Sequence, residues 1–307
     1  MAEITAAMVK ELREKSGAGM LDCKKALAEN GGDMDAAVDY LRKKGLASAA
    51  KKSGRAAAEG LVSVETDGKN GVIVELNAET DFVARNEQFQ KFLDEATALT
   101  LKDGIADVEA LKAATLNGKP VQDNLTDLIA SIGENMSLRR VGRLGVSEGL
   151  VASYVHNTLS PGRGKIGVLV ALESSGDAGK LADLGRQLAM HIAAARPEAL
   201  DVDSLDQEVV ARERAVHADK AKQSGKPDEI VEKMVDGSMR KYYEQVVLLQ
   251  QAFIIDGKTK VADVLAAAEK DVGAPVKLAS YIRFELGEGV EKKEDDFAAE
   301  VSKIAAG

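Results

Sequence analysis

A carboxylate and an aromatic ring stand side by side where a buried strand gives way to a helix. Residues 71–76 read GVIVEL, an apolar and β-branched run typical of a buried strand, and a polar turn follows it. In that turn Thr80 and Asp81 are both good N-cap residues, and Phe82 comes directly after them. An amphipathic helical pattern then runs through 89–99. The predicted strand therefore leads directly into a turn that carries a carboxylate and an aromatic ring.

Two interpretations of Asp81 and Phe82 are open. In the first, which the pattern alone favours, Asp81 caps the helix and Phe82 packs into the core. In the second, the turn presents the acid and the ring together as a surface for another protein.

The sequence PGRGKIG at 161–167 resembles a phosphate-binding loop in composition. It lacks the P-loop spacing, and no serine or threonine follows Lys165, so a hairpin turn between two strands is the better account. No recognisable nucleophile elbow or paired-carboxylate pattern stands out elsewhere. An enzyme that uses residues 148–172 as a small-ligand site stays an alternative, but the sequence favours an interaction protein.

The residue types of metal ligands are present without the spacing of a metal site. His156, His191 and His217 are far apart and match no ligand pattern with Cys23, so we expect no metal and no cofactor. His191 lies on the apolar face of its predicted helix and is interpreted as a core histidine. Cys23 is the one cysteine, so it forms no internal disulfide, and we interpret it as a small core residue.

Composition indicates a soluble globular protein. The chain has 307 residues, 45% apolar and 30% charged. A net charge of -9 disfavours a ribosome- or RNA-binding module, and basic residues gather only at 42–55. No stretch approaches the about 18 uncharged apolar residues of a membrane span, and the first residues have a helical rather than a signal-peptide pattern. We expect a cytoplasmic protein that binds neither membrane nor nucleic acid directly.

The first 45 residues predict a small docking module. Three short helices are expected at 5–15, 21–29 and 33–44, with glycines turning the chain between them. A unit of this size exposes much apolar surface for its volume, which suits docking better than catalysis. Residues 46–58 are rich in alanine and basic residues, and we interpret them as a linker, partly helical at most.

The rest of the chain contains an internal duplication. The sequence Glu-Gly-Leu-Val opens a strand at 59–62 and again at 148–151, and each copy continues into an apolar strand, a helix and a last strand ending in Glu-Gly. We expect an α+β fold with two subdomains, each a three-stranded antiparallel sheet with helices. The predicted boundaries are 59–147 for the first, and 148–203 with 242–290 for the second.

An insertion interrupts the second copy. Residues 204–241 have sparse apolar positions and dense charges, and the Ser-Gly-Lys-Pro at 224–227 separates two helices. We predict an antiparallel helical hairpin that projects from the body or packs on a partner, and it is a candidate homodimer contact. Residues 291–307 predict a C-terminal helical module, with Phe297, Val301 and Ile304 at helical spacing.

Three stretches together resemble a known family. They are Thr80-Asp81-Phe82-Val83, the run KELREKSGAGMLDCKKAL at 10–27 and the run IRFELGEGVEK at 282–292. With them the chain resembles bacterial elongation factor Ts, the guanine nucleotide exchange factor of elongation factor Tu, along nearly its whole length. The resemblance implies an amino-terminal three-helix, UBA-like module. It also implies a protein that binds elongation factor Tu with GDP bound and without nucleotide, and that is not an enzyme.

The resemblance assigns expected roles to particular residues. The motif Thr80 to Val83 is expected to enter the G domain of elongation factor Tu and displace Mg²⁺, so that GDP leaves and GTP can reload. The residues expected to dock the amino-terminal module on the same domain are Arg13, Met20, Leu21 and Lys24. Leu21 replaces a second methionine found in some members, a volume-conserving change.

Two further contacts follow from the resemblance. The sequence Ser-Tyr-Val-His at 153–156 places His156 at a partner-binding histidine of the family, although the loop after it, 157–165, is longer here. The sequence QQAFI at 250–254 places Phe253 and Ile254 at an apolar contact with the partner's body. Exchange by such a protein is linkage: a factor that binds the nucleotide-free partner more tightly must weaken nucleotide binding by the same ratio.

Overall fold

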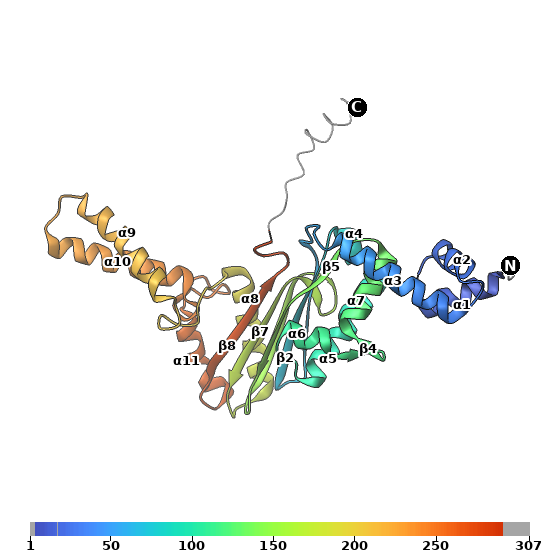
Figure 1. Cartoon of the computed structure of the whole chain (residues 1–307). Helices are drawn as coiled ribbons and strands as arrows, with labels where there is room; N and C mark the ends of the chain where they lie inside the picture. The colour runs from blue at the N-terminus through green and yellow to red at the C-terminus, as the bar shows by residue number, and fades with distance from the viewer. Residues whose placement is uncertain (1–3, 17, 291–307) are drawn as a thin grey trace. The chain divides into compact units, whose positions relative to one another are not determined.

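The computed structural model describes residues 4–16 and 18–290, which form two compact units (Figure 1). Unit 1 comprises the described residues up to Ser63, Val74–Val141 and those from Glu285 on, and unit 2 comprises Val64–Ile73 and Gly142–Phe284. The predicted C-terminal helix at 291–307 lies outside the described residues. Every helix in the described part of the chain is too short or too polar to cross a membrane.

Unit 1 contains the amino-terminal helices and a layer of helices on a sheet. Its helices are α1 (Ala6–Ser16), α2 (Met20–Glu29), α3 (Met34–Lys52), α4 (Asp81–Ala84), α5 (Glu87–Asp103), α6 (Val108–Ala113) and α7 (Val121–Ile132). Strands β1 (Glu59–Thr66), β2 (Asn70–Ala78) and β5 (Met136–Gly145) lie largely in it, together with the two-residue strands β3 (Thr115–Leu116) and β4 (Lys119–Pro120). Helices α5, α6 and α7 bury their apolar faces with β1, β2 and β5 in one core, which includes Leu76, Phe89, Leu93, Leu125 and Leu138.

Unit 2 has a core of its own. It contains strands β6 (Leu150–Ser160), β7 (Arg163–Glu173) and β8 (Lys277–Glu285), and helices α8 (Ala178–Ala195), α9 (Gln207–Lys222), α10 (Asp228–Val246) and α11 (Val261–Val272), with a short 3₁₀ turn at Leu248–Gln250. Strands β6 and β7 are antiparallel, with Leu150 opposite Leu172 and His156 opposite Ile166. Apolar residues of β7, α8 and α11 form the core, which includes Val168, Leu172, Leu188, Ile192 and Leu265.

The helices and antiparallel strands confirm the α+β class, but the prediction of two separate three-stranded sheets is wrong. The strands are hydrogen-bonded in the order β5-β2-β1-β7-β6, and β8 also pairs with β7, so six strands make one sheet. Two separate sheets would each leave an additional edge with unpaired N–H and C=O groups. The sequence pattern of a strand carries no record of the strands that lie beside it in the sheet.

The repeated Glu-Gly pair has the same local geometry in both copies. Gly60 has φ +124° and Gly149 has φ +114°, a region that favours glycine. A Cβ on Gly60 would stand 2.2 Å from the carbonyl oxygen of Leu76, and one on Gly149 would stand 2.0 Å from that of Leu172. Glycine is therefore required at both positions because the neighbouring strand passes against its backbone.

The amino-terminal helices pack on a small core that is separate from the rest of unit 1 and includes Val9, Leu12, Leu27 and Leu41. Cys23 is fully buried in it, which confirms the prediction of a core cysteine. The predicted end of the third helix at 44 is wrong, because α3 continues to Lys52 and takes up the first part of the expected linker. Alanine-rich sequence favours helix, and Gly45 does not stop α3: a Cβ there would stand 3.3 Å from the Cβ of Ala130 in α7, so glycine permits close helix packing.

Helices α9 and α10 form the predicted hairpin. They are joined by the turn at 223–227, lie side by side and project from the rest of unit 2 (Figure 1). Their shared apolar strip is narrow, with Ala221, Val231, Val235 and Met239 buried. Arg214 pairs with Asp236 across the two helices at 2.9 Å.

Candidate functional site

Phe82 points away from the protein at the start of α4. Its side chain is 79% exposed, whereas Val83 and Ala84 are 4% and 6% exposed in the core of unit 1. Successive residues of a helix are turned by about 100°, so burying Val83 and Ala84 directs Phe82 outward. The interpretation in which Phe82 packs into the core is therefore wrong. We call residues Thr80–Ala84 the tip.

Neither polar residue of the tip caps the helix with its side chain. Thr80 occupies the N-cap position, but its hydroxyl makes no cap hydrogen bond. Instead its backbone N–H and its Oγ1 donate to the two carboxylate oxygens of Glu134, at 3.0 and 2.8 Å. Asp81 is exposed in the first turn of α4. The amphipathic helix predicted after the motif is a separate element, α5, which is capped by Asn86.

A second carboxylate binds in the reverse direction. Glu79 accepts from the backbone N–H of Asn135 at 2.5 Å and from the guanidinium of Arg55 at 3.3 Å. The Asn135 side chain donates to the carbonyl oxygen of Arg55 at 2.8 Å. Two carboxylates thus join residues 79–80 to residues 134–135. Glu134 accepts hydrogen bonds from Thr80 in the first segment, and Glu79 accepts one from Asn135 in the second. The roles of Glu79 and Glu134 could not be predicted from the sequence, because side-chain partners about 55 residues apart leave no local signal.

The amino-terminal helices display a second pair of apolar side chains. Met20 and Leu21, in the first turn of α2, are 50% and 84% exposed. Lys24 is exposed on the same helix, and Arg13 is exposed on α1. Arg13 lines one hollow together with Gly19, the residue before α2, so Arg13 lies near the start of the helix that carries Met20, Leu21 and Lys24.

His156 lies on an exposed stretch of β6. Its Nδ1 is 3.1 Å from the hydroxyl oxygen of Tyr154, two residues away on the same strand. The expected long loop at 157–165 is wrong, since β6 continues to Ser160 and β7 begins at Arg163. Only Pro161 and Gly162 form the turn, which confirms the predicted hairpin. The additional residues lengthen two paired strands because their backbone groups find partners across the hairpin.

Phe253 and Ile254 have different environments. Phe253 is 4% exposed in the core of unit 2, with its ring centroid 5.7 Å from that of His191, so its expected direct contact with a partner is wrong. Ile254 is 49% exposed and Ile255 57%. Ile255 was not predicted as a contact. Two successive β-branched residues just before Asp256-Gly257 are the signal that could have identified it, since such a turn rarely needs both for packing.

His191 is buried and holds the backbone next to these isoleucines. It is 1% exposed, which confirms the prediction of a core histidine. Its Nδ1 accepts a hydrogen bond from the N–H of Ile254 at 3.2 Å, so Nε2 carries the proton and donates to Oε1 of Gln251 at 2.9 Å. Burial lowers the pKa of His191 below its ordinary 6.5, in part offset by the bond to Gln251.

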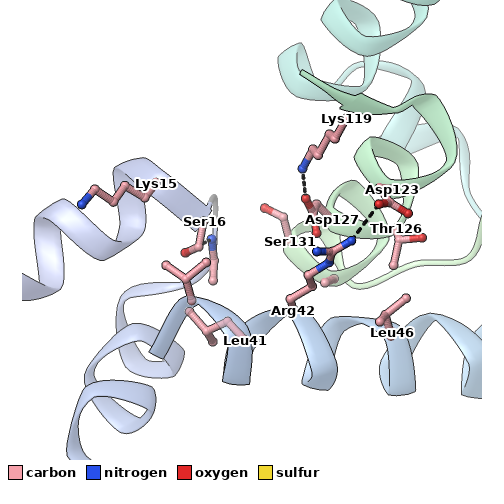
Figure 2. A pocket seen from close by; sticks show the side chains of 13 residues that line it. Lys15, Ser16, Leu41, Arg42, Leu46, Lys119, Asp123, Thr126, Asp127 and Ser131 are labelled. Carbon is pink, nitrogen blue, oxygen red and sulfur yellow. Dashed lines mark hydrogen bonds and ion pairs between the residues drawn. The ribbon is translucent and has the colours of Figure 1, made fainter. Parts of the chain in front are cut away.

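A cleft of about 250 Å³ lies among α1, α3 and α7 (Figure 2). Figure 2 shows Arg42 of α3 reaching Asp123 of α7, a 2.9 Å ion pair, and Lys119 pairing with Asp127. Arg42 and Lys119 are each paired with a carboxylate in the cleft, so neither cation offers an uncompensated charge to a ligand. The cleft is not formed by residues 148–172, the region named for an enzyme alternative. The described residues hold no cluster of histidine, cysteine and acidic side chains suited to a metal ion.

The sequence model of the family described as Elongation factor TS matches residues 79–288, which include the whole tip. This chain belongs to the elongation factor Ts family. Curated members of the family align along 98–100% of their own length. Elongation factor Ts of Rhodospirillum centenum is 62% identical over 307 residues, covering 99% of this chain and 100% of that protein. Those of Sphingopyxis alaskensis and Paramagnetospirillum magneticum are 61% and 60% identical, each over 99% of this chain. The alignments thus include the amino-terminal residues as well as the region of the family match.

Proposed function

We propose that the chain is the guanine nucleotide exchange factor of elongation factor Tu, which binds its partner with GDP bound and without nucleotide and promotes GDP release. Membership of the elongation factor Ts family supports the role. The observation that carries the proposal is Phe82, 79% exposed on a turn whose neighbours are anchored. An aromatic side chain costs free energy in water, and a partner that buries it recovers that cost.

We propose that the tip acts by dislocating Mg²⁺. Phe82 wedges into the partner's G domain, and exposed Asp81 competes for groups that orient the ion. Mg²⁺ requires near-ideal octahedral oxygen geometry, so a small shift of the surrounding groups is enough to lose it and then GDP. Thr80 and Val83 support this action from inside the chain, through the bonds to Glu134 and through burial.

The other displayed residues are proposed to provide affinity. Met20 and Leu21, with Arg13 and Lys24, dock residues 1–45 on the same G domain. His156 makes a contact in unit 2. At 250–254 we now propose Ile254 as the contact, with Ile255 added and with Phe253 holding the turn from the core. Aromatic residues, methionine and arginine are enriched at protein interfaces.

The remaining organisation is also a proposal. The core subdomains 59–147 and 148–203 with 242–290 present these surfaces, after the residues 46–58 that connect them to the docking module. The hairpin 204–241 offers a contact for a second copy of the chain, and the protein acts in the cytoplasm. No cofactor and no covalent step are needed, because exchange follows from differential binding.

A release assay tests the proposal. Elongation factor Tu carrying a fluorescent GDP is mixed with excess unlabelled GDP and increasing amounts of this chain. We expect the release rate to rise and then saturate, because release proceeds within the complex of the two proteins. A chain that leaves the release rate unchanged at every concentration would contradict the proposed function.

A further inference from the structure

We propose that Glu134 is a positioning residue for exchange: its carboxylate, by holding Thr80, fixes the direction in which the tip presents Phe82. The inference rests on the proposed function. Glu134 touches neither partner nor nucleotide in this proposal, and it acts through Thr80 and α4. It follows Gly133, which ends α7 with φ +92°, so the end of that helix aims Glu134 at the tip.

The tip needs such support because it is too short to orient itself. Helix α4 has four residues, and the hydrogen bonds that close it run from Arg85 N–H to Phe82 O and from Asn86 N–H to Val83 O, at 3.1 and 2.9 Å. A single helical turn is unstable in isolation, since nucleation fixes several dihedrals for few bonds. Its direction is therefore set by contacts outside the helix.

Glu134 supplies these contacts with both carboxylate oxygens. One accepts the backbone N–H of Thr80 and the other accepts its hydroxyl, so main chain and side chain of a single residue are held together. Without this carboxylate, the Thr80 hydroxyl would be free to cap α4 and its N–H would need water. Charge-assisted hydrogen bonds are stronger than neutral ones. The two bonds thus select one rotamer of Thr80 and one entry angle for α4.

The support behind Glu134 is itself rigid. Asn135, the next residue, is bound to Glu79 and Arg55, which adds a second link beside the first. Helix α7, which leads into Glu134, packs closely on α3, with Gly45 permitting the approach of Ala130. Two links joining the same pair of segments resist rotation as well as displacement.

The first test separates positioning from affinity. Glu134→Ala, Glu134→Gln and a matched control, Glu109→Ala, are titrated in the release assay. Glu109 pairs with Lys112 on its own helix and has no bond to the tip. We expect Glu134→Ala to lower the maximal release rate roughly tenfold at an unchanged half-saturating concentration. Glu134→Gln, which keeps an acceptor oxygen, should recover much of the rate, and Glu109→Ala should match the parent.

A double substitution tests whether Glu134 acts through Phe82. In a Phe82→Ala chain the direction of the tip no longer matters, so adding Glu134→Ala should cause no further loss of maximal rate. A full, additive loss in the double variant, or a parental maximal rate in Glu134→Ala, would overturn the proposal. Should Glu134→Ala melt below the assay temperature, Glu134→Asp replaces it. Asp withdraws the carboxylate by one methylene and is expected to change the rate in the same direction.

A measurement on the chain alone distinguishes this inference from the proposed function. Amide hydrogen exchange of residues 80–86 should become faster in Glu134→Ala, while that of residues 20–29 stays as in the parent. Unchanged exchange at 80–86 would show that Glu134 does not hold the tip. If the parent fails to release GDP, the proposed function falls, and the exchange of residues 80–86 still decides whether the carboxylate positions the tip.

Discussion

The tip and the loop at 251–259 display apolar side chains in the same way but hold them by different chemistry. In each, an exposed residue stands next to a buried anchor: Phe82 beside Val83, and Ile254 beside Phe253. In each, a side chain from another element accepts a backbone N–H of the displayed segment, Glu134 at Thr80 and His191 at Ile254. We call residues 251–259 the isoleucine loop.

The acceptors differ in capacity. The carboxylate of Glu134 takes two hydrogen bonds at once, whereas the imidazole of His191 has one acceptor nitrogen and loses it on protonation. The isoleucine loop compensates with a buried aromatic anchor, which the tip lacks, since Val83 is smaller. The tip is thus held mainly by polar bonds and the isoleucine loop mainly by packing. We therefore expect substitution of the buried anchor in the isoleucine loop to lower stability, and substitution of the exposed residues of the tip to lower activity.

The largest expected effect is on stability, at the anchor of the isoleucine loop. Phe253→Ala removes a ring from the core of unit 2 and should lower the free energy of unfolding by about 3–5 kcal/mol. The matched control Ile254→Ala removes a half-exposed side chain and should stay within about 1 kcal/mol. Urea unfolding measures both. Equal losses would mean that Ile254, too, belongs to the core and is not a contact.

The next effect concerns the tip, where activity should fall and stability should not. Asp81→Ala with Phe82→Ala removes exposed groups, so melting should change little, but the maximal release rate should fall about a hundredfold, equivalent to about 2.7 kcal/mol. Met20→Ala with Leu21→Ala is the control: it should raise the half-saturating concentration and restore the full rate at saturation. A tip variant that melts far below the parent and still releases GDP at the parental rate would show that Asp81 and Phe82 support the fold and not the exchange.

The smallest expected effect is a pH dependence that His191 gives to the stability of unit 2. Since burial lowers the pKa of His191 below 6.5, the unfolded chain takes up a proton near pH 6.5 that the folded chain resists. The contribution of His191 is therefore complete above about pH 6.5 and is lost progressively as the pH falls below it. His191→Phe should flatten the fall in unfolding free energy between pH 7 and pH 5. An unchanged slope would assign the fall to other groups.

Local sequence signals predicted much of the fold. Apolar periodicity located α5 and α8, glycines located the ends of α2 and the turn of the hairpin, and the repeated Glu-Gly pair located the start of each duplicated half. These features depend on neighbours a few residues away. The joining of six strands in one sheet depends on edge pairing between distant strands, which periodicity does not encode.

The candidate site depends on exposure, which local pattern predicts poorly. Asp81 and Phe82 are exposed in the structure, whereas pattern alone favours a buried Phe82, because an aromatic residue before an apolar run is usually core. The burial of Phe253 was missed for the converse reason: its partner, His191, lies some 60 residues earlier in the sequence. Likewise Thr80 is an ordinary N-cap residue in sequence. Its hydrogen bonds to Glu134, which follows α7, become apparent only in the structure.

The exposure of Phe82 also makes the chain suited to optical study. The sequence contains no tryptophan, so Phe82→Trp would create a single indole in the whole protein, at the end of a defined support. Its emission would report one environment within this chain, because no other indole of the chain contributes. On mixing with a partner, the rate at which that emission shifts to shorter wavelength would measure how fast the indole enters an apolar environment. This measurement needs no label on the nucleotide.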